Sequence, residues 1–122
     1  SYISFEYAMS RYGLIPESVY AITSATTRIT RTFTVNNKSF EYSHIKKQAY
    51  RGYRAEKIDG VTVLMAEPEK AFVDYYYFVD LKLRRHNDRL ITRPLNKKIA
   101  MEYAALFKLK SMKSGSNSNS TN

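Results

Sequence analysis

The chain of 122 residues has no cysteine, no tryptophan, only four glycines and only three prolines. Without cysteine it can form neither a disulfide framework nor a thiolate metal site, and thiol catalysis is excluded. The few glycines build no phosphate-binding loop of the type found in nucleotide-binding enzymes. No apolar run approaches the roughly 18 residues that a membrane-spanning helix needs, and no signal peptide is visible. We therefore expect a cytoplasmic protein without a membrane partner.

Acidic residues are also scarce. Eleven Asp and Glu stand against twenty Lys and Arg, which gives a formal net charge of +9. Residues 1–60 hold nine basic and five acidic residues, residues 61–80 hold one and four, and residues 81–113 hold ten and two. A basic excess favours a polyanion or an acidic protein surface as partner. The alternative is that these charges only keep the protein in solution.

Aromatic residues, in contrast, are abundant. Eleven tyrosines and six phenylalanines contribute to an apolar content of 43%, which is enough for the core of one ordinary domain. Because tyrosine is amphipathic, part of this set is expected at a wet surface.

Three stretches have the periodicity of helices. The first is expected at residues 5–12, where Ser4 can cap the start and Gly13 can close the end. The second is expected to open at Pro68, since a missing N–H is harmless in the first turn. The third is expected at about residues 95–110.

Two β-hairpins are predicted from their turn residues. Asn36-Asn37 separates two alternating segments, and Asn accepts the positive φ of a tight turn. Asp59-Gly60 lies between two further strand-like segments and is the pair that a type I′ turn favours.

Further strands follow from residue type and alternation. Residues 19–23 are expected to form a strand, and the apolar run 61–66 is expected to be a central strand buried on both faces. Around the first turn, Phe33 and Val35 alternate with Thr32, which is expected to point outward.

These elements predict a small mixed α+β domain, in which two β-hairpins form a sheet packed by about three to four helices. The domain is expected to span residues 1–113. Residues 114–122 are rich in Ser and Asn and cannot bury enough apolar area to offset the entropy of ordering, so a disordered tail is expected there.

No arrangement typical of catalysis is visible. His44 and His86 lie far apart without carboxylates at metal-ligand spacing, so both are expected to be structural or surface residues. One enzymatic alternative is a metal-dependent nuclease, for which the neighbouring candidates are Glu56, Asp59, Glu67, Glu69 and Lys70. A turn aspartate and acids at a helix start need no chemistry to explain them. We therefore predict no catalytic residue, no cofactor and no metal site.

Basic residues remain as candidates for a binding surface. Cations hold phosphates, and the nearby Tyr50 and Tyr53 could stack on bases or bond to a phosphate. The same cations could pair with carboxylates of a protein partner, and composition does not separate the two. The candidate partner-binding residues are Arg28, Arg31, Lys46, Lys47, Arg51, Arg54, Arg84, Arg85, Arg89 and Arg93.

Four motifs occur in a fixed order over about residues 1–80. They are S-x-x-x-A-x-x-x-x-G-L-I-P (4–16), T-S-A-T-T with T-R-T-F (23–27 and 30–33), Y-x-H-I-K (42–46) and P-E-K-A-x-x-D (68–74). In this order they resemble the C-terminal region of AbiEi-type antitoxins, the transcriptional regulators of bacterial type IV toxin–antitoxin systems that act in abortive infection.

The resemblance implies a binding protein and not an enzyme. Such a domain would antagonise a nucleotidyltransferase-type toxin and support the binding of promoter DNA in autoregulation. Its partners would be DNA, through phosphate contacts, the cognate toxin protein, or both. Family members carry an N-terminal winged helix-turn-helix domain, which is absent before Ser1, so we expect operator reading to lie outside this chain. The alternative is a free-standing basic nucleic-acid-binding module without a toxin partner.

Overall fold

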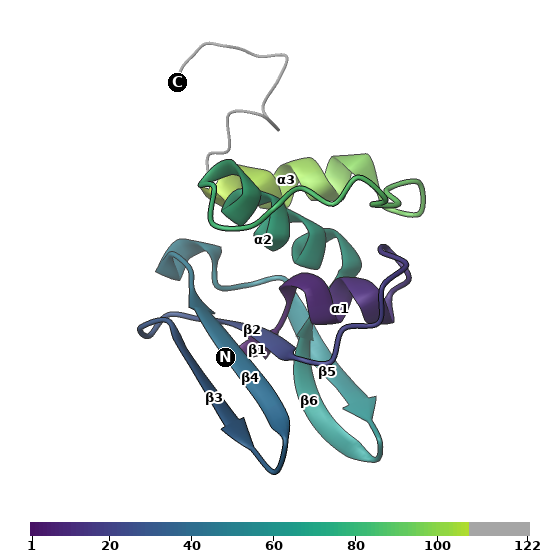
Figure 1. Cartoon of the computed structure of the whole chain (residues 1–122). Coiled ribbons are helices and arrows are strands. Elements are labelled where there is room, and N and C mark those ends of the chain that lie inside the picture. The colour runs from purple at the N-terminus through teal and green to yellow at the C-terminus, as the bar shows by residue number, and fades with distance from the viewer. Residues whose placement is uncertain (108–122) are drawn as a thin grey trace.

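The computed structural model describes residues 1–107. In this part of the chain six strands form one mixed sheet, and three α-helices are stacked at one end of it (Figure 1). The predicted α+β class is therefore confirmed. The predicted tail (114–122) and the last residues of the third predicted helix lie outside the described residues.

The described residues form six strands, three α-helices and one short 3-10 helix. They are β1 (Tyr2–Ile3), α1 (Phe5–Arg11), β2 (Ile22–Thr26), β3 (Arg31–Val35), β4 (Lys38–His44), the 3-10 helix η1 (Lys47–Ala49), β5 (Tyr53–Ile58), β6 (Val61–Ala66), α2 (Pro68–Asp80) and α3 (Lys97–Phe107).

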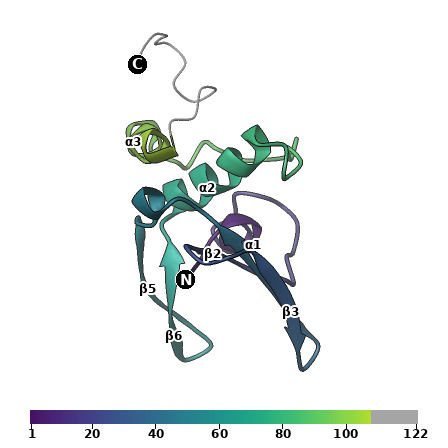
Figure 2. The same ribbon diagram turned by 90° about the vertical axis from the view of Figure 1, so that its left-hand side faces the viewer.

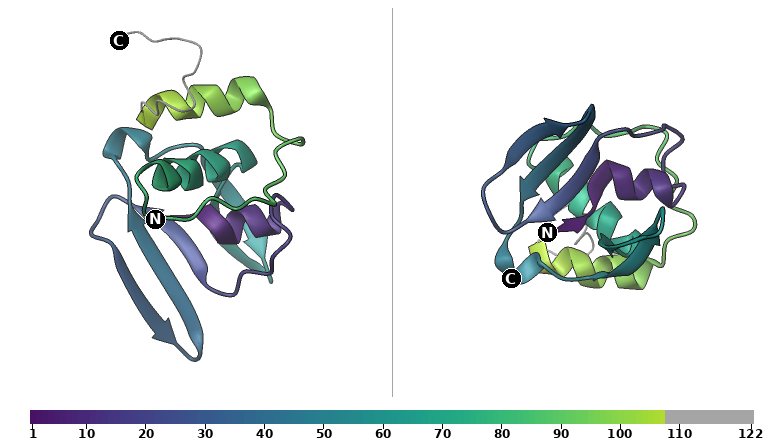
Figure 3. Two further views of the ribbon diagram at one scale, coloured as in Figure 1. Left: turned by 45° about the horizontal axis from the view of Figure 1, so that its top comes forward. Right: turned by 90° about the horizontal axis from the view of Figure 1, so that it is seen from below.

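The two-residue strand β1 lies inside the sheet, whose order is β3-β4-β2-β1-β6-β5. It runs antiparallel to β2 and forms one parallel pair with β6, between Ile3 and Met65. β3 and β4 form one hairpin, β5 and β6 form the other, and β2 runs parallel to β4. Seen from below, the two hairpins lie on either side of β1 (Figure 3, right). A very short strand thus joins two hairpins into one sheet.

The helices lie in layers at one end of the hairpins. α1 is nearest the sheet, and α2 lies between α1 and α3 (Figures 1 and 3). Side chains from all three helices meet in the core, among them Phe5, Met9, Val73, Phe78 and Phe107. The turns of both hairpins point away from the helices (Figure 2), so only the hairpin ends near the helices are covered.

Both predicted hairpin turns are present. Asn36 and Asn37 have φ angles of 50° and 66°, and Asp59 and Gly60 have φ angles of 51° and 79°. These positive values are the ones that a two-residue type I′ turn requires, which is why Asn, Asp and Gly occupy them. The turn residues therefore set the register of each hairpin.

The first helix begins and ends close to the predicted positions, and the second begins where predicted. Gly13 follows α1 with φ +75°, and Pro68 opens α2. Ser4 lies at the N-cap of α1, but its side chain does not cap the helix. Its hydroxyl instead donates to the Asp74 carboxylate at 2.7 Å, a contact between residues far apart in sequence.

Two strand predictions are wrong in part. β2 begins at Ile22 and not at residue 19, because its hydrogen-bonding partners, β1 and β4, lie alongside residues 22–26 only. β6 is not buried on both faces. Val61 is 60% exposed and Leu64 is 43% exposed, since this end of the hairpin extends beyond the helices.

Thr32 is exposed as predicted, but Phe33 and Val35, which alternate with it, are not buried. Phe33 is 37% exposed and Val35 is 49% exposed, and every residue of β3 is solvent-accessible. β3 is an edge strand, and the alternation of its side chains separates two solvent-facing surfaces. Apolar alternation alone does not reveal whether a helix covers the apolar face.

Gly52 offers a test of the packing between β5 and the helices. Its φ is +84°, and a Cβ there would lie 2.9 Å from Lys70 Cγ and 3.0 Å from the Tyr103 ring, whereas a Cβ on Gly13 meets nothing within 4 Å. We expect Gly13→Ala to lower the free energy of unfolding by about 1 kcal/mol through its positive φ alone. Gly52→Ala should cost at least about 1 kcal/mol more because of the steric overlap.

Equilibrium urea unfolding of the two variants measures this difference. Equal losses in the two variants would contradict close packing of Lys70 and Tyr103 against Gly52.

Candidate functional site

The ten basic residues predicted to bind a partner do not form one patch. Four of them lie together where β4 ends, and we call these the β4-end basic group: Arg28, Lys46, Lys47 and Arg51. None of the four forms an ion pair with a carboxylate in the described part of the chain. Arg28, Lys47 and Arg51 are exposed, and Lys46 is half-buried.

The strand register explains why this group comes together. Thr26 of β2 lies beside His44 of β4, and the Ile45 N–H donates to the Thr26 carbonyl at 2.8 Å. His44 Nδ1 lies 3.0 Å from the Arg28 carbonyl oxygen. The turn after β2 is therefore held against the segment that enters η1, which brings Arg28 close to the lysines that follow β4.

A second set of basic residues lies on the segment between α2 and α3. Arg85 and Arg93 are exposed there, and Arg89 forms an ion pair with Glu17. This segment runs back along α1, where the Ile91 N–H donates to the Leu14 carbonyl at 2.7 Å. These basic residues are thus separate in the fold from the β4-end basic group.

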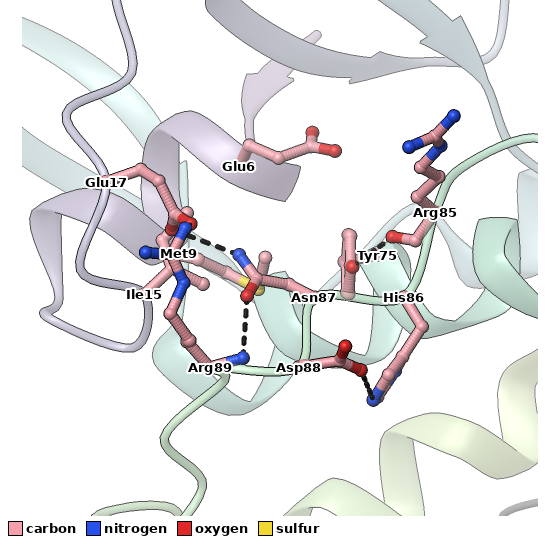
Figure 4. Close-up of a pocket in the computed structure, with 10 residues that line it drawn as sticks. All are labelled: Glu6, Met9, Ile15, Glu17, Tyr75, Arg85, His86, Asn87, Asp88 and Arg89. Carbon is pink, nitrogen blue, oxygen red and sulfur yellow. Dashed lines mark hydrogen bonds and ion pairs between the residues drawn. The ribbon is translucent and has the colours of Figure 1, made fainter.

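The same segment forms one wall of a pocket of about 500 Å³ (Figure 4). The Asn87 amide donates to Glu17 at 3.0 Å and accepts the Arg89 N–H at 2.8 Å, while the Tyr75 hydroxyl donates to the Arg85 carbonyl. The pKa of Glu17 is lowered, chiefly by its hydrogen bond with Asn87. Polar atoms of the pocket wall therefore bind one another and hold the segment against α1.

Arg84 is held by contacts within the fold. Its guanidinium carbon lies 4.4 Å from the centroid of the Phe5 ring and 5.0 Å from that of Phe78. Its Nε lies 3.0 and 2.9 Å from the two carboxylate oxygens of Glu6, and the side chain is only 14% exposed. Arg84 thus joins the segment after α2 to α1 and has little surface left for a partner.

The last two candidates lie on edge strands. Arg54 on β5 pairs with Glu56 at 2.7 Å, and this hydrogen bond raises the pKa of Arg54. Arg31 on β3 lies over the Phe33 ring, 5.3 Å from its centroid, and has no carboxylate partner among the described residues.

Sequence reasoning missed a buried polar network that joins β1, α1 and α2. Lys70 donates to Asp74 Oδ1 at 2.5 Å and to the Tyr2 hydroxyl at 2.7 Å. Tyr2 and Ser4 donate to Asp74 Oδ2 at 2.8 and 2.7 Å. Lys70, Asp74 and Ser4 are 0% exposed, and Tyr2 is 1% exposed.

The hydrogen bonds of this network fit a carboxylate beside an ammonium. The Asp74 carboxylate accepts three donors, and Lys70 donates two hydrogen bonds. Burial raises the pKa of Asp74 and lowers that of Lys70, and each partner opposes the shift of the other. Burial also raises the pKa of Tyr2. The sequence signal was a Lys–Asp pair at i, i+4 within the apolar face of α2.

The tyrosines near the basic residues point inward instead of forming a wet surface. The rings of Tyr50 and Tyr53 lie 5.1 and 4.8 Å from the Tyr2 ring. From α3, Tyr103 donates to Glu67 at 2.6 Å, and burial followed by this bond raises the pKa of Tyr103 to about 12. These half-buried side chains pack β5 and α3 around the buried network.

The acidic residues considered for a nuclease site each bind a different partner within the fold. Glu56 pairs with Arg54, Glu67 accepts the Tyr103 hydroxyl, and Glu69 accepts the Asn96 N–H at 2.9 Å. Among residues 1–107, no group of three or more His, Cys, Asp or Glu is placed to hold a metal ion.

Both histidines lie at the surface. His44 contacts the Arg28 carbonyl, and His86 Nε2 lies 3.9 Å from Asp88. These contacts agree with the predicted structural or surface role of the two residues.

No family model, curated protein or solved structure matches this chain. The resemblance to AbiEi-type antitoxins therefore rests on the four sequence motifs. None of the helices within residues 1–107 has the length and apolar character needed to cross a membrane.

Asp74→Asn tests the charge state of the buried network. The change leaves the Lys70 ammonium buried without a counter-charge, so the folded-state pKa of Lys70 should fall further below its unfolded value. The unfolded chain then binds more protons than the folded one. The free energy of unfolding should therefore rise between about pH 7 and about pH 10, by at most about 1.4 kcal/mol per pH unit.

Urea unfolding across this pH range measures the slope. The wild-type protein should show a shallower rise, and Lys70→Met/Asp74→Leu, which removes both charges, should show none from this site. A slope in Asp74→Asn no steeper than in the wild type would contradict an ion pair in the core.

Arg84→Ala tests the structural reading of Arg84. The variant loses two ring contacts and the pair with Glu6, so its free energy of unfolding should fall by about 2 kcal/mol. Arg85→Ala is the matched control, because that side chain is exposed, and should stay within about 0.5 kcal/mol of the wild type. Thermal or urea unfolding measures this difference. If both variants lose equally little free energy of unfolding, Arg84 has no structural role and is again a candidate for partner binding.

Proposed function

We propose that this chain is the interaction domain of an AbiEi-like antitoxin and transcriptional regulator of the cytoplasm. In this proposal it acts by binding and without substrate turnover. It antagonises a nucleotidyltransferase-type toxin and supports promoter binding in autoregulation, while sequence-specific operator reading belongs to a winged helix domain outside this chain.

The observation that carries the proposal is the way the four motifs meet in space. Ser4 of the first motif donates to Asp74 of the fourth at 2.7 Å. Thr23 of the second motif donates to the Ser4 carbonyl at 2.6 Å. Ile45 of the third motif donates from its N–H to Thr26 of the second. Motifs that are separated in sequence thus form one connected framework, which supports reading them as a single family pattern.

The β4-end basic group is the docking surface that suits this role best. Arg28, Lys47 and Arg51 lie outside the four motifs, and Lys46 ends the third one. None of these four cations has a carboxylate partner within residues 1–107. Unpaired surface cations attract either acidic side chains of a protein or phosphates of DNA, because neither partner must displace an internal ion pair.

The test is co-expression with the product of the neighbouring gene, which this proposal expects to be a nucleotidyltransferase-type toxin. The wild-type chain should restore growth and co-purify with the toxin, and Lys47→Glu/Arg51→Glu should weaken both effects. Lys97→Glu/Lys98→Glu makes the same change of charge on exposed residues of α3 and should leave both unchanged. If the wild-type chain neither protects growth nor co-purifies, the antitoxin role is wrong.

Duplex DNA provides the second arm of this test. If phosphates contact Lys47 and Arg51, the double variant should bind duplex DNA more weakly for every sequence, with a salt dependence shallower by roughly two in log–log slope. Duplex binding without any toxin effect would favour a free-standing nucleic-acid-binding module.

A further inference from the structure

The β3–β4 hairpin carries three neighbouring rings, which we call the aromatic strip: Phe33, Phe40 and Tyr42. The Phe33 centroid lies 5.6 Å from those of both Phe40 and Tyr42, with ring planes inclined by 22° and 15°. The antiparallel register pairs Phe33 with Phe40 and Arg31 with Tyr42, so all four side chains share one face. Phe33 is exposed, and the other two rings are half-buried.

Most of the aromatic strip faces away from the helix nearest the sheet. Thr32 and Glu41 alternate with the strip and line a pocket of about 620 Å³ together with Glu6 of α1. Tyr42 also borders this pocket, whereas Phe33 and Phe40 do not. The face of the hairpin that looks toward α1 is therefore mainly polar. The hairpin also projects away from the helical layers (Figure 2). Phe33, at the centre of the strip, is 37% exposed.

Cations flank the aromatic strip at both ends, and no acid shares its face. Arg31 lies over the Phe33 ring at one end, and Lys38, paired in register with Val35, lies at the turn end. Glu41 is the only acidic residue of the two strands, and it is on the opposite face. Arg28 and the lysines after β4 extend the positive charge beyond the strip.

We propose that the aromatic strip is a binding site for single-stranded nucleic acid. Aromatic side chains on a sheet stack on unpaired bases, and flanking cations hold the phosphates between them. The strip covers a strand of five residues, about 13 Å from first to last at the usual rise, which leaves room for two or three bases. Paired bases in a duplex cannot reach the rings, so the site selects unpaired strands.

Observations on the hairpin favour this ligand over a protein strand added to the free edge of β3. Strand addition uses backbone hydrogen bonds and gives no reason for three nearly parallel rings between Arg31 and Lys38. A charged edge residue such as Arg31 also opposes edge-to-edge pairing. The proposal stands apart from the antitoxin role, because it can be measured without any toxin.

The experiment uses the 122-residue chain and fluorescence anisotropy with labelled oligo(dT) and oligo(U) about ten nucleotides long. Phe33→Leu keeps an apolar side chain but removes one stacking ring, and we expect binding of both probes to weaken roughly tenfold. A duplex of the same length should change less than about twofold. Thr34→Ala, on the same strand and the opposite face, is the matched control and should bind like the wild type.

A second measurement holds even if Phe33→Leu disturbs the hairpin. Titration of the wild-type chain with oligo(dT) should shift amide NMR signals of residues 31–42 first. Shifts confined to the β4-end basic group would overturn the proposal, and so would equal weakening of single strands and duplex in Phe33→Leu. A wild-type dimer that Phe33→Leu dissociates, without single-strand binding, would assign the strip to a second copy of this chain.

Discussion

The ion pair between Lys70 and Asp74 is the contact on which the rest of this fold depends. It lies where β1, the start of α1 and α2 meet. Lys70 Nζ and both carboxylate oxygens of Asp74 each form a hydrogen bond with Tyr2, with Ser4 or with each other. Buried pairs add little net stability, because desolvation offsets their attraction, but an unmatched charge in the core is very unfavourable. We therefore infer that the pair acts mainly on specificity, because its hydrogen bonds match only one register of α2 on β1.

The charge surplus divides into cations that build the fold and cations that remain outside it. Arg84 and Arg89 hold the segment after α2 against α1 through Glu6 and Glu17, so their charges are answered within the chain. The β4-end basic group and Arg31 have no such partners in the described residues. Net charge alone therefore overstates the area available for binding, and the geometry directs attention to one half of the sheet.

Sequence reasoning located the parts governed by local chemistry. Turn residues such as Asn36 and Asp59, and Pro68 at a helix start, have conformational preferences that tertiary packing did not override. Sequence reasoning failed where the burial of a side chain depends on the elements packed against it. Phe33 alternates like a core residue but has no helix above it, and Lys70 looks like a surface charge but has Asp74 beside it. The sequence identified the basic candidates by residue type alone. The pairing of β2 with β4 is needed to show that Arg28 lies near Lys46, and the contact with Glu6 is needed to show that Arg84 is already paired.

The shortness of β1 has a mechanical consequence. Only one residue pair links it to β6, so very few backbone bonds tie the two halves of the sheet together. Side chains add to this link, such as the Tyr2 ring of β1 that stacks on Tyr53 of β5. A change in the angle between the two hairpins would therefore break few backbone hydrogen bonds. Because the aromatic strip and the β4-end basic group both belong to the β3–β4 half, such a change would move the two surfaces together.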